Sequence, residues 1–109
     1  MQHYHLYILA FRDEPIIKVG IAEKPKSRFR QLGLDRFDFS KSYLVQAQNR
    51  VVITLLERSL KVLLGEHRRE SVRPLESGNT EIFCETVVPQ MMGVIESFRK
   101  RLEGLLASE

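Results

Sequence analysis

The sequence lacks the features that define several common protein classes. Its 109 residues include one cysteine, Cys84, so an intrachain disulfide is impossible and a reducing, cytoplasmic setting is expected. No apolar run approaches the roughly 20 residues needed to span a bilayer, and the first residues lack the pattern of a signal peptide. The histidines and the cysteine do not fall in zinc-ligand spacing. We therefore expect neither a membrane partner nor a zinc site.

The composition fits one small globular domain covering residues 1–109. A hydrophobic fraction of 43% is enough for a single core. The net charge of +3 permits binding to a polyanion without requiring it. The first 55 residues carry nine lysines and arginines against five acidic residues, so the basic surplus lies in the N-terminal half.

Two segments rich in β-branched and aromatic residues predict an N-terminal β-hairpin. Residues 3–11 alternate between two faces, with Leu6 and Ile8 on one and Tyr7 on the other. Residues 12–15 form the turn, and residues 16–22 form the second strand. A third strand is expected over residues 42–48, and residues 80–84 are predicted to be a short strand or an extended arm.

Apolar residues at helical spacing predict three helices. The first covers residues 25–32 and stops at Gly33, and the second runs from residue 50 to about 64 behind Asn49 as its N-cap. The last covers residues 89–106. The expected fold class is α+β, with a small, mostly antiparallel three-stranded sheet flanked by helices.

The order of these elements, together with several short motifs, resembles the GIY-YIG nuclease superfamily, especially its small phage-type branch. Tyr7 stands at the first signature tyrosine. Arg28 follows Lys18 by ten residues, the spacing from the second signature tyrosine to the family's arginine. Glu57 matches the glutamate of the long helix, and Thr80-Glu81-Ile82-Phe83 is similar to a late motif of the phage-type branch.

The resemblance implies metal-assisted cleavage of DNA by a phage or mobile-element type of enzyme. In that mechanism Tyr7 helps to position or activate water, Arg28 stabilises the phosphate, and Glu57 holds a single Mg²⁺. These parts match what phosphodiester cleavage requires: activated water, a cation at the phosphate, and a metal at the leaving oxygen.

The sequence departs from the family pattern at two positions that handle protons. Lys18 stands where the second tyrosine is expected, or Ile17 does if the alignment shifts by one. Lys61 occupies the place where the phage-type branch often has a histidine. A lysine of ordinary pKa is protonated and a poor base at neutral pH, and loss of a general base typically costs about 10²–10⁴-fold. Either Tyr4 or Tyr43 is available to replace the missing tyrosine.

The basic residues of the first helix have two interpretations. Lys24, Lys26, Arg28 and Arg30, with Lys18 as a replacement phosphate contact, form either a DNA-binding face or a solvated helix surface. Similarly, Glu57 either holds metal or pairs with a lysine one helical turn later. Two functions follow: a Mg²⁺-dependent endonuclease, or a catalytically inactive protein of this fold that binds nucleic acid or a protein partner.

Overall fold

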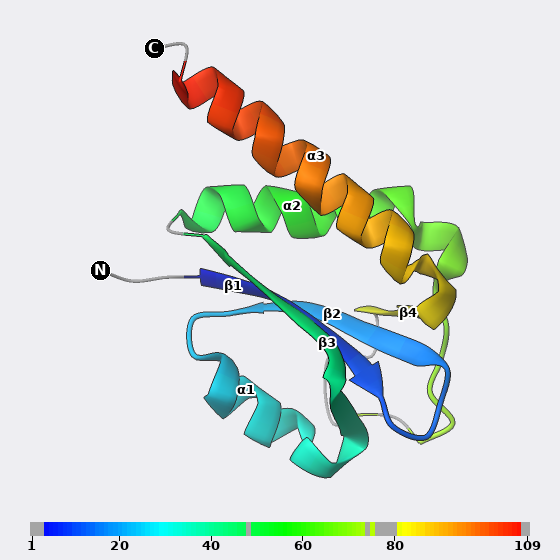
Figure 1. Cartoon of the computed structure of the whole chain (residues 1–109). Coiled ribbons are helices and arrows are strands. Elements are labelled where there is room, and N and C mark those ends of the chain that lie inside the picture. Colours follow the sequence, from blue (N-terminus) through cyan, green and yellow to red (C-terminus); the bar gives the residue numbers. More distant parts are fainter. Residues whose placement is uncertain (1–3, 48, 74, 76–80, 108–109) are drawn as a thin grey trace.

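The computed structural model describes residues 4–47, 49–73, 75 and 81–107, and it confirms the α+β class. Strands and helices follow the predicted order along the chain (Figure 1). The strands are β1 (Tyr4–Phe11), β2 (Ile16–Ala22), β3 (Phe37–Ala47) and β4 (Ile82–Cys84), and the helices are α1 (Pro25–Leu32), α2 (Arg50–Leu63) and α3 (Val88–Ala107).

The sheet has four strands, so the expectation of three was wrong. Its order is β3-β1-β2-β4, and every neighbouring pair is antiparallel. The segment predicted as a short strand or arm is β4, which pairs with β2 from Ile16↔Cys84 to Lys18↔Ile82. Ile82 and Phe83 are fully buried, and this burial holds a strand that is too short to show any periodicity in the sequence.

Strand β3 begins at Phe37, five residues before the predicted start. Phe37 is fully buried and its ring packs edge-on against Phe11, with centroids 5.0 Å apart. A register shift between β1 and β3 follows, at which the Ser42 hydroxyl accepts a hydrogen bond from the Ala10 amide at 3.0 Å. This irregularity interrupts the alternation that sequence patterns rely on. The predicted end of the strand, Gln48, lies outside the described residues.

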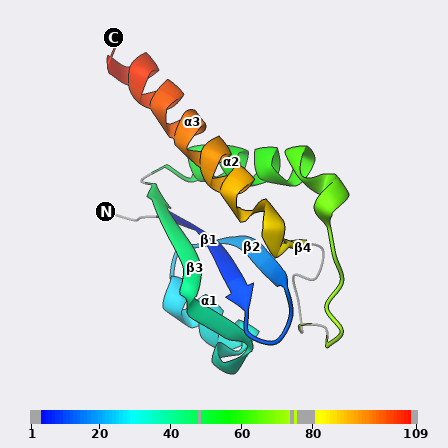
Figure 2. The same cartoon turned by 45° about the vertical axis from the view of Figure 1, so that its right-hand side comes forward.

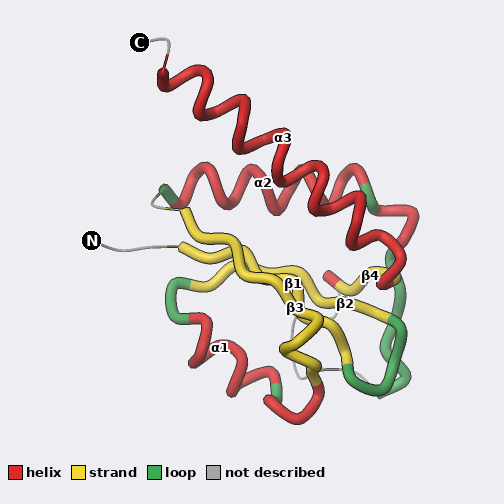
Figure 3. Tube along the Cα trace, viewed as in Figure 1, coloured by secondary structure: helices red, strands yellow, loops and turns green. Residues whose placement is uncertain are grey.

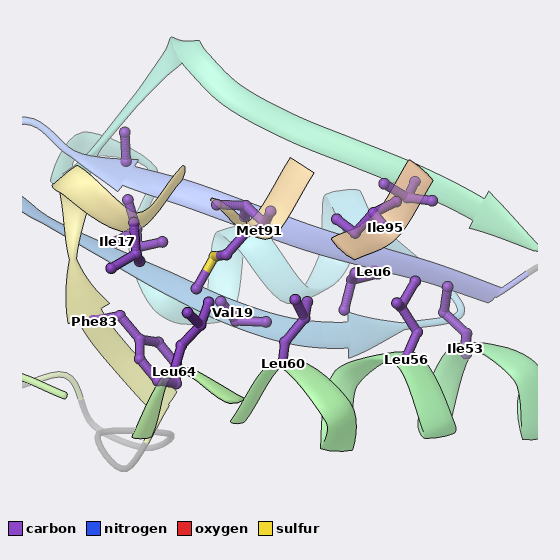
Figure 4. Packing of buried hydrophobic residues seen from close by; sticks show 14 residues of the cluster. Leu6, Ile17, Val19, Ile53, Leu56, Leu60, Leu64, Phe83, Met91 and Ile95 are labelled. Atoms are coloured by element: carbon purple, nitrogen blue, oxygen red, sulfur yellow. The ribbon is translucent and has the colours of Figure 1, made fainter. Parts of the chain in front are cut away.

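Helices cover both faces of the sheet: α1 lies on one, and α2 and α3 lie on the other (Figures 1 and 2). Strand β1 is central, and its side chains alternate between the two faces as predicted. Leu6 and Ile8 join the cluster under α2 and α3, whose packing is drawn in Figure 4, whereas Tyr7 and Leu9 join the cluster on the side of α1. The two clusters share the sheet as their common wall.

The helix ends follow the predicted signals. The Asn49 side chain accepts a hydrogen bond from the Val51 amide at 2.8 Å and so caps α2. Gly33 ends α1 with a φ of 102°, a conformation that favours glycine. The last turns of α3 extend beyond the sheet (Figure 3). Within the described residues, no helix has the length and apolar character needed to cross a membrane.

Candidate functional site

Tyr7 lies on the α1 side of the central strand and carries its hydroxyl to the edge of the core. Its ring packs edge-on against Phe29 of α1, with centroids 5.4 Å apart, and is 1% exposed. Across the strands it faces Gly20, where a Cβ atom would stand 2.2 Å from the hydroxyl oxygen. The Arg28 guanidinium donates a hydrogen bond from Nε to this oxygen at 3.5 Å. Glycine at position 20 is therefore what leaves room for the tyrosine.

Among the described residues, Lys18 is the one charged side chain that is fully buried, with no exposed surface. Its Nζ donates to Glu81 Oε2 at 2.6 Å and to the carbonyl oxygen of Val19 at 3.3 Å. Glu81 comes directly before Ile82, the residue of β4 that pairs with Lys18. Because an isolated buried ammonium is very costly, this carboxylate is what allows a lysine within the sheet.

The charges continue from Glu81 to helix α2. Lys61 Nζ lies 2.9 Å from Glu81 Oε1 and 3.4 Å from Glu57 Oε1. The four side chains thus alternate in sign along a chain of contacts that runs from Lys18 through Glu81 and Lys61 to Glu57. Lys61 and the two carboxylates are all less than one-third exposed, so water screens these contacts less than it screens a surface pair.

Burial and neighbouring charge shift the pKa values of the site in opposite directions. Burial raises the pKa of Tyr7, although the Arg28 hydrogen bond opposes that effect. Burial also lowers the pKa of Lys18, with Glu81 opposing it. For Glu81, burial is the largest single influence and would raise the pKa, but Lys18 and Lys61 together outweigh it and hold the pKa below its usual value. Tyr7 is therefore protonated and Glu81 ionised at neutral pH.

The polar cluster lies where the sheet is incomplete. Strand β1 pairs with the inner edge of β2 as far as Ala22, but β4 pairs with its outer edge only as far as Lys18, and no other described strand lies along that outer edge. Here Lys61 of α2 bonds Glu81, which in turn bonds Lys18 of β2. The charge of Arg28 lowers the pKa of Tyr7, and the charges of Glu81 and Glu57 raise it. Residues from both sides of the sheet therefore share one electrostatic environment.

A pocket of about 510 Å³ adjoins this cluster. One wall is the end of β2 with the residues that follow it, and the other wall is the polar side of α2. Its lining residues are Tyr4, Ile21, Ala22, Glu23, Arg50, Thr54, Glu57, Arg58 and Lys61.

Of the three residues predicted to be catalytic, Arg28 is hydrogen-bonded to Tyr7. No hydrogen bond or ion pair among the described residues joins Glu57 to either of them, and Glu57 acts on Tyr7 only through its charge, which raises the pKa of the hydroxyl. The predicted replacement phosphate contact, Lys18, is instead enclosed by protein and bonded to Glu81. Such an ammonium presents nothing to a phosphate outside, so its evident effect is to hold Glu81 in place.

The remaining basic residues of the prediction lie on α1 and just before it. Lys24, Lys26 and Arg30 are exposed, whereas Arg28 is half-buried and turned toward Tyr7. The alternative interpretation of Glu57 also has support, because it does pair with Lys61 one turn later.

Sequence reasoning missed the central position of Glu81, which bonds both lysines. A signal was present: Lys18 is the one charge within the apolar strand Ile16–Ala22, and a charge in a strand buried on both faces needs a partner. In the sequence, Glu81 stands out only as part of a motif. The motif's first residue, Thr80, lies outside the described residues.

The fit of a divalent metal rests on Glu57. Mg²⁺ is commonly bound through one or two carboxylates with water and substrate phosphates completing its shell. Glu57 lines the pocket and holds Lys61 by a longer contact than Glu81 does, so its carboxylate suits such a role. Glu81 does not, because both its oxygens are already bonded to lysines. Within the described part of the chain, this site included, no three His, Cys, Asp or Glu side chains group as a metal site.

Comparison of the chain with protein-family models, with curated proteins and with solved structures finds no match.

Proposed function

We propose that this protein is a GIY-YIG-type endonuclease that cleaves DNA with the help of Mg²⁺ and works in the cytoplasm. The observation that carries the proposal is the hydrogen bond from Arg28 to Tyr7, with Glu57 near enough for its charge to act on the pKa of the same hydroxyl. These three residues come from β1, α1 and α2, and they are the ones that the resemblance in sequence implies.

The energetic cost of the cluster supports a functional role. Replacing a buried ion pair by well-packed apolar residues is often neutral or stabilising, so stability alone gives little reason for Lys18 and Glu81 to be charged. Perturbed titratable groups that face a pocket are typical of functional sites. The pairing of Lys18 with Glu81 and of Lys61 with Glu57 leaves Arg28 as the cation beside the tyrosine hydroxyl.

Each residue then has a defined task. Arg28 stabilises negative charge on the scissile phosphate. Tyr7 keeps its proton at neutral pH, so its hydroxyl orients water or a phosphate oxygen and does not act as the base. Glu57 would hold Mg²⁺, which when bound neutralises charge on the phosphate. Lys18 and Lys61 position Glu81 and Glu57. With no strong base at hand, cleavage is expected to be slow.

A second candidate function is DNA binding without cleavage. It is favoured by the observation that lysines already neutralise both carboxylates of the cluster. In this case, Arg28 and the exposed Lys24, Lys26 and Arg30 contact the phosphate backbone, and no metal is required.

The test is incubation of the purified protein with supercoiled plasmid and Mg²⁺ or Mn²⁺, alongside an Arg28→Ala, Glu57→Ala double variant. We expect the variant to lose at least about 100-fold of the nicking rate, the typical cost of removing one charge-stabilising group. A Lys41→Ala, Glu96→Ala variant removes one charge of each sign from exposed positions on β3 and α3 and should match the wild type.

Gel electrophoresis of the plasmid distinguishes the two candidate functions. Nicking that needs metal and disappears in the double variant supports the nuclease. Equal nicking by wild type and double variant would identify a contaminating nuclease and overturn the assignment. No nicking, together with DNA binding that weakens with salt and survives Glu57→Ala, supports the non-cleaving binder. Absence of both activities would overturn both candidates and favour a protein-binding role.

A further inference from the structure

The pocket beside the cluster contains two arginines to which no role has yet been assigned. Arg50, Thr54 and Arg58 follow each other at intervals of four along α2, and Glu57 and Lys61 fall on the same side. This side is separate from the side that packs on the sheet through Ile53, Leu56 and Leu60 (Figure 4). Helix α2 therefore has a charged stripe along one wall of the pocket.

Arg50 and Arg58 differ from the lysines of the cluster because no carboxylate among the described residues pairs with them. Both are exposed, and neither forms an ion pair with any residue in the described part of the chain. Lys61, by contrast, lies between two carboxylates. The pocket also contains the exposed Glu23, so its two free cations face one free carboxylate.

The pocket is continuous with the proposed cleavage site. Glu57 and Lys61 belong both to the cluster and to the pocket lining. The opposite wall, which ends at Glu23, runs directly into Lys24 and helix α1. In Figure 1 the end of β2, the start of α1 and the first turn of α2 lie at the same side of the molecule. A DNA strand that crosses the cluster would therefore meet cations of α1 on one side and cations of α2 on the other.

We infer that Arg50 and Arg58 form a second phosphate-binding subsite, which holds the backbone of a DNA strand along α2 on the far side of the cluster from α1. This inference rests on the proposed function, because the ligand is the same DNA. The pocket volume of about 510 Å³ is within the usual range for a small-ligand site and gives room for a nucleotide. The guanidinium group suits the ligand, because its planar donors match the oxygens of a phosphate.

The test measures binding of a fluorescein-labelled single-stranded DNA oligonucleotide without divalent metal, so that cleavage cannot interfere. Each lost phosphate contact lowers the salt dependence of binding, by about 0.7 in the slope of log K against log salt for single strands. We expect the Arg50→Gln, Arg58→Gln double variant to reduce the magnitude of that negative slope by about 1.4. The matched control is Lys41→Gln, Lys100→Gln, which removes two exposed cations on β3 and α3 and should leave the slope unchanged.

The outcomes distinguish this inference from the proposed function. A lower slope in the arginine variant alone, with circular dichroism showing an unchanged fold, supports the subsite. A slope equal to that of the control overturns the subsite, while Arg28-dependent nicking by the same preparation would leave the nuclease assignment standing. No measurable binding by the wild type overturns the subsite. If Arg28-dependent nicking is absent too, the proposed function fails with it.

Discussion

The two faces of the sheet are covered by different kinds of side chain. On the side of α2 and α3, the buried cluster is wholly apolar and runs from Leu6 and Ile8 to Leu60, Met91 and Ile95. On the side of α1, the buried cluster mixes aliphatic and aromatic side chains, and the sheet carries Tyr7 and Lys18 among them. The first face is closed by apolar packing alone, whereas the second also buries two polar groups, each of which depends on a specific partner.

The difference separates stability from chemistry. Burial of aliphatic side chains is non-directional and supplies the main drive to fold. The α1 side instead depends on directed contacts: the Arg28–Tyr7 hydrogen bond, the close approach of Tyr7 to Gly20, and the bond between Lys18 and Glu81. Substitutions on the two sides should therefore have different consequences.

The largest effect is expected on the apolar face. Leu60 has no exposed surface, so Leu60→Ala removes buried methyl groups and leaves a cavity, which costs about 2–5 kcal/mol of unfolding free energy. Urea denaturation measures this loss. Val62→Ala is the control on the same helix, because Val62 is 81% exposed and should change stability by less than about 0.5 kcal/mol. Equal costs for the two variants would mean that α2 does not pack through Leu60.

A smaller effect is expected on the charged side. Glu81→Ala leaves the buried Lys18 ammonium without its carboxylate. Breaking a buried pair costs about 3–5 kcal/mol, and we expect about 2–3 kcal/mol because Glu81 is 25% exposed and partly screened. Lys18→Met in the same chain should recover most of that loss, since no unpaired charge then remains.

The double variant sharpens the comparison of the two faces. Lys18→Met, Glu81→Ala is expected to unfold near the wild-type urea midpoint while its DNA cleavage or binding is impaired, because Lys61 loses Glu81, its partner just before β4. If the two single substitutions were additive in stability, the Lys18–Glu81 pair would not be coupled, contrary to the 2.6 Å contact.

The smallest effect is expected in the pH dependence of stability. The pKa of Glu81 is lowered in the folded protein, so its contribution is present above its unfolded pKa, near 4.5, and is lost as pH falls through the folded pKa. Glu14 and Asp38 have lowered pKa values too and act with the same sign. The measurement is therefore a difference: Glu81→Gln should show a shallower loss of stability below about pH 5 than the wild type. Parallel curves would contradict the assigned pairing.

The fold could be predicted where local signals were strong. Strand β2 and helix α1 were predicted with the bounds that the structure has, because Pro15, Pro25 and Gly33 mark where these segments begin or end. The faces of β1 followed from simple alternation. The early start of β3 could not be predicted, because a register shift and aromatic contacts with Phe11 determine it.

The site could be predicted only in part, for a related reason. Tyr7, Arg28 and Glu57 stand out only through the resemblance, and nothing in their own spacing shows that Arg28 bonds Tyr7. The link between Lys18 and Glu81 joins residues 63 positions apart, and it forms because β4 adds to the sheet beside β2. A contact of that kind depends on the tertiary pairing of a three-residue strand, which is the element that local sequence describes least well.

The early end of β4 has a consequence for solubility. A strand without a partner presents free amide and carbonyl groups on which another chain can align, which is a common route to aggregation. In the described part of the chain, the outer edge of β2 lacks such a partner beyond Lys18, and Glu57, Lys61 and Glu81 occupy this region. Charged side chains at an open edge are among the devices by which proteins prevent sheets from joining. The residues that form the candidate site would then also discourage two copies of this protein from sticking together there.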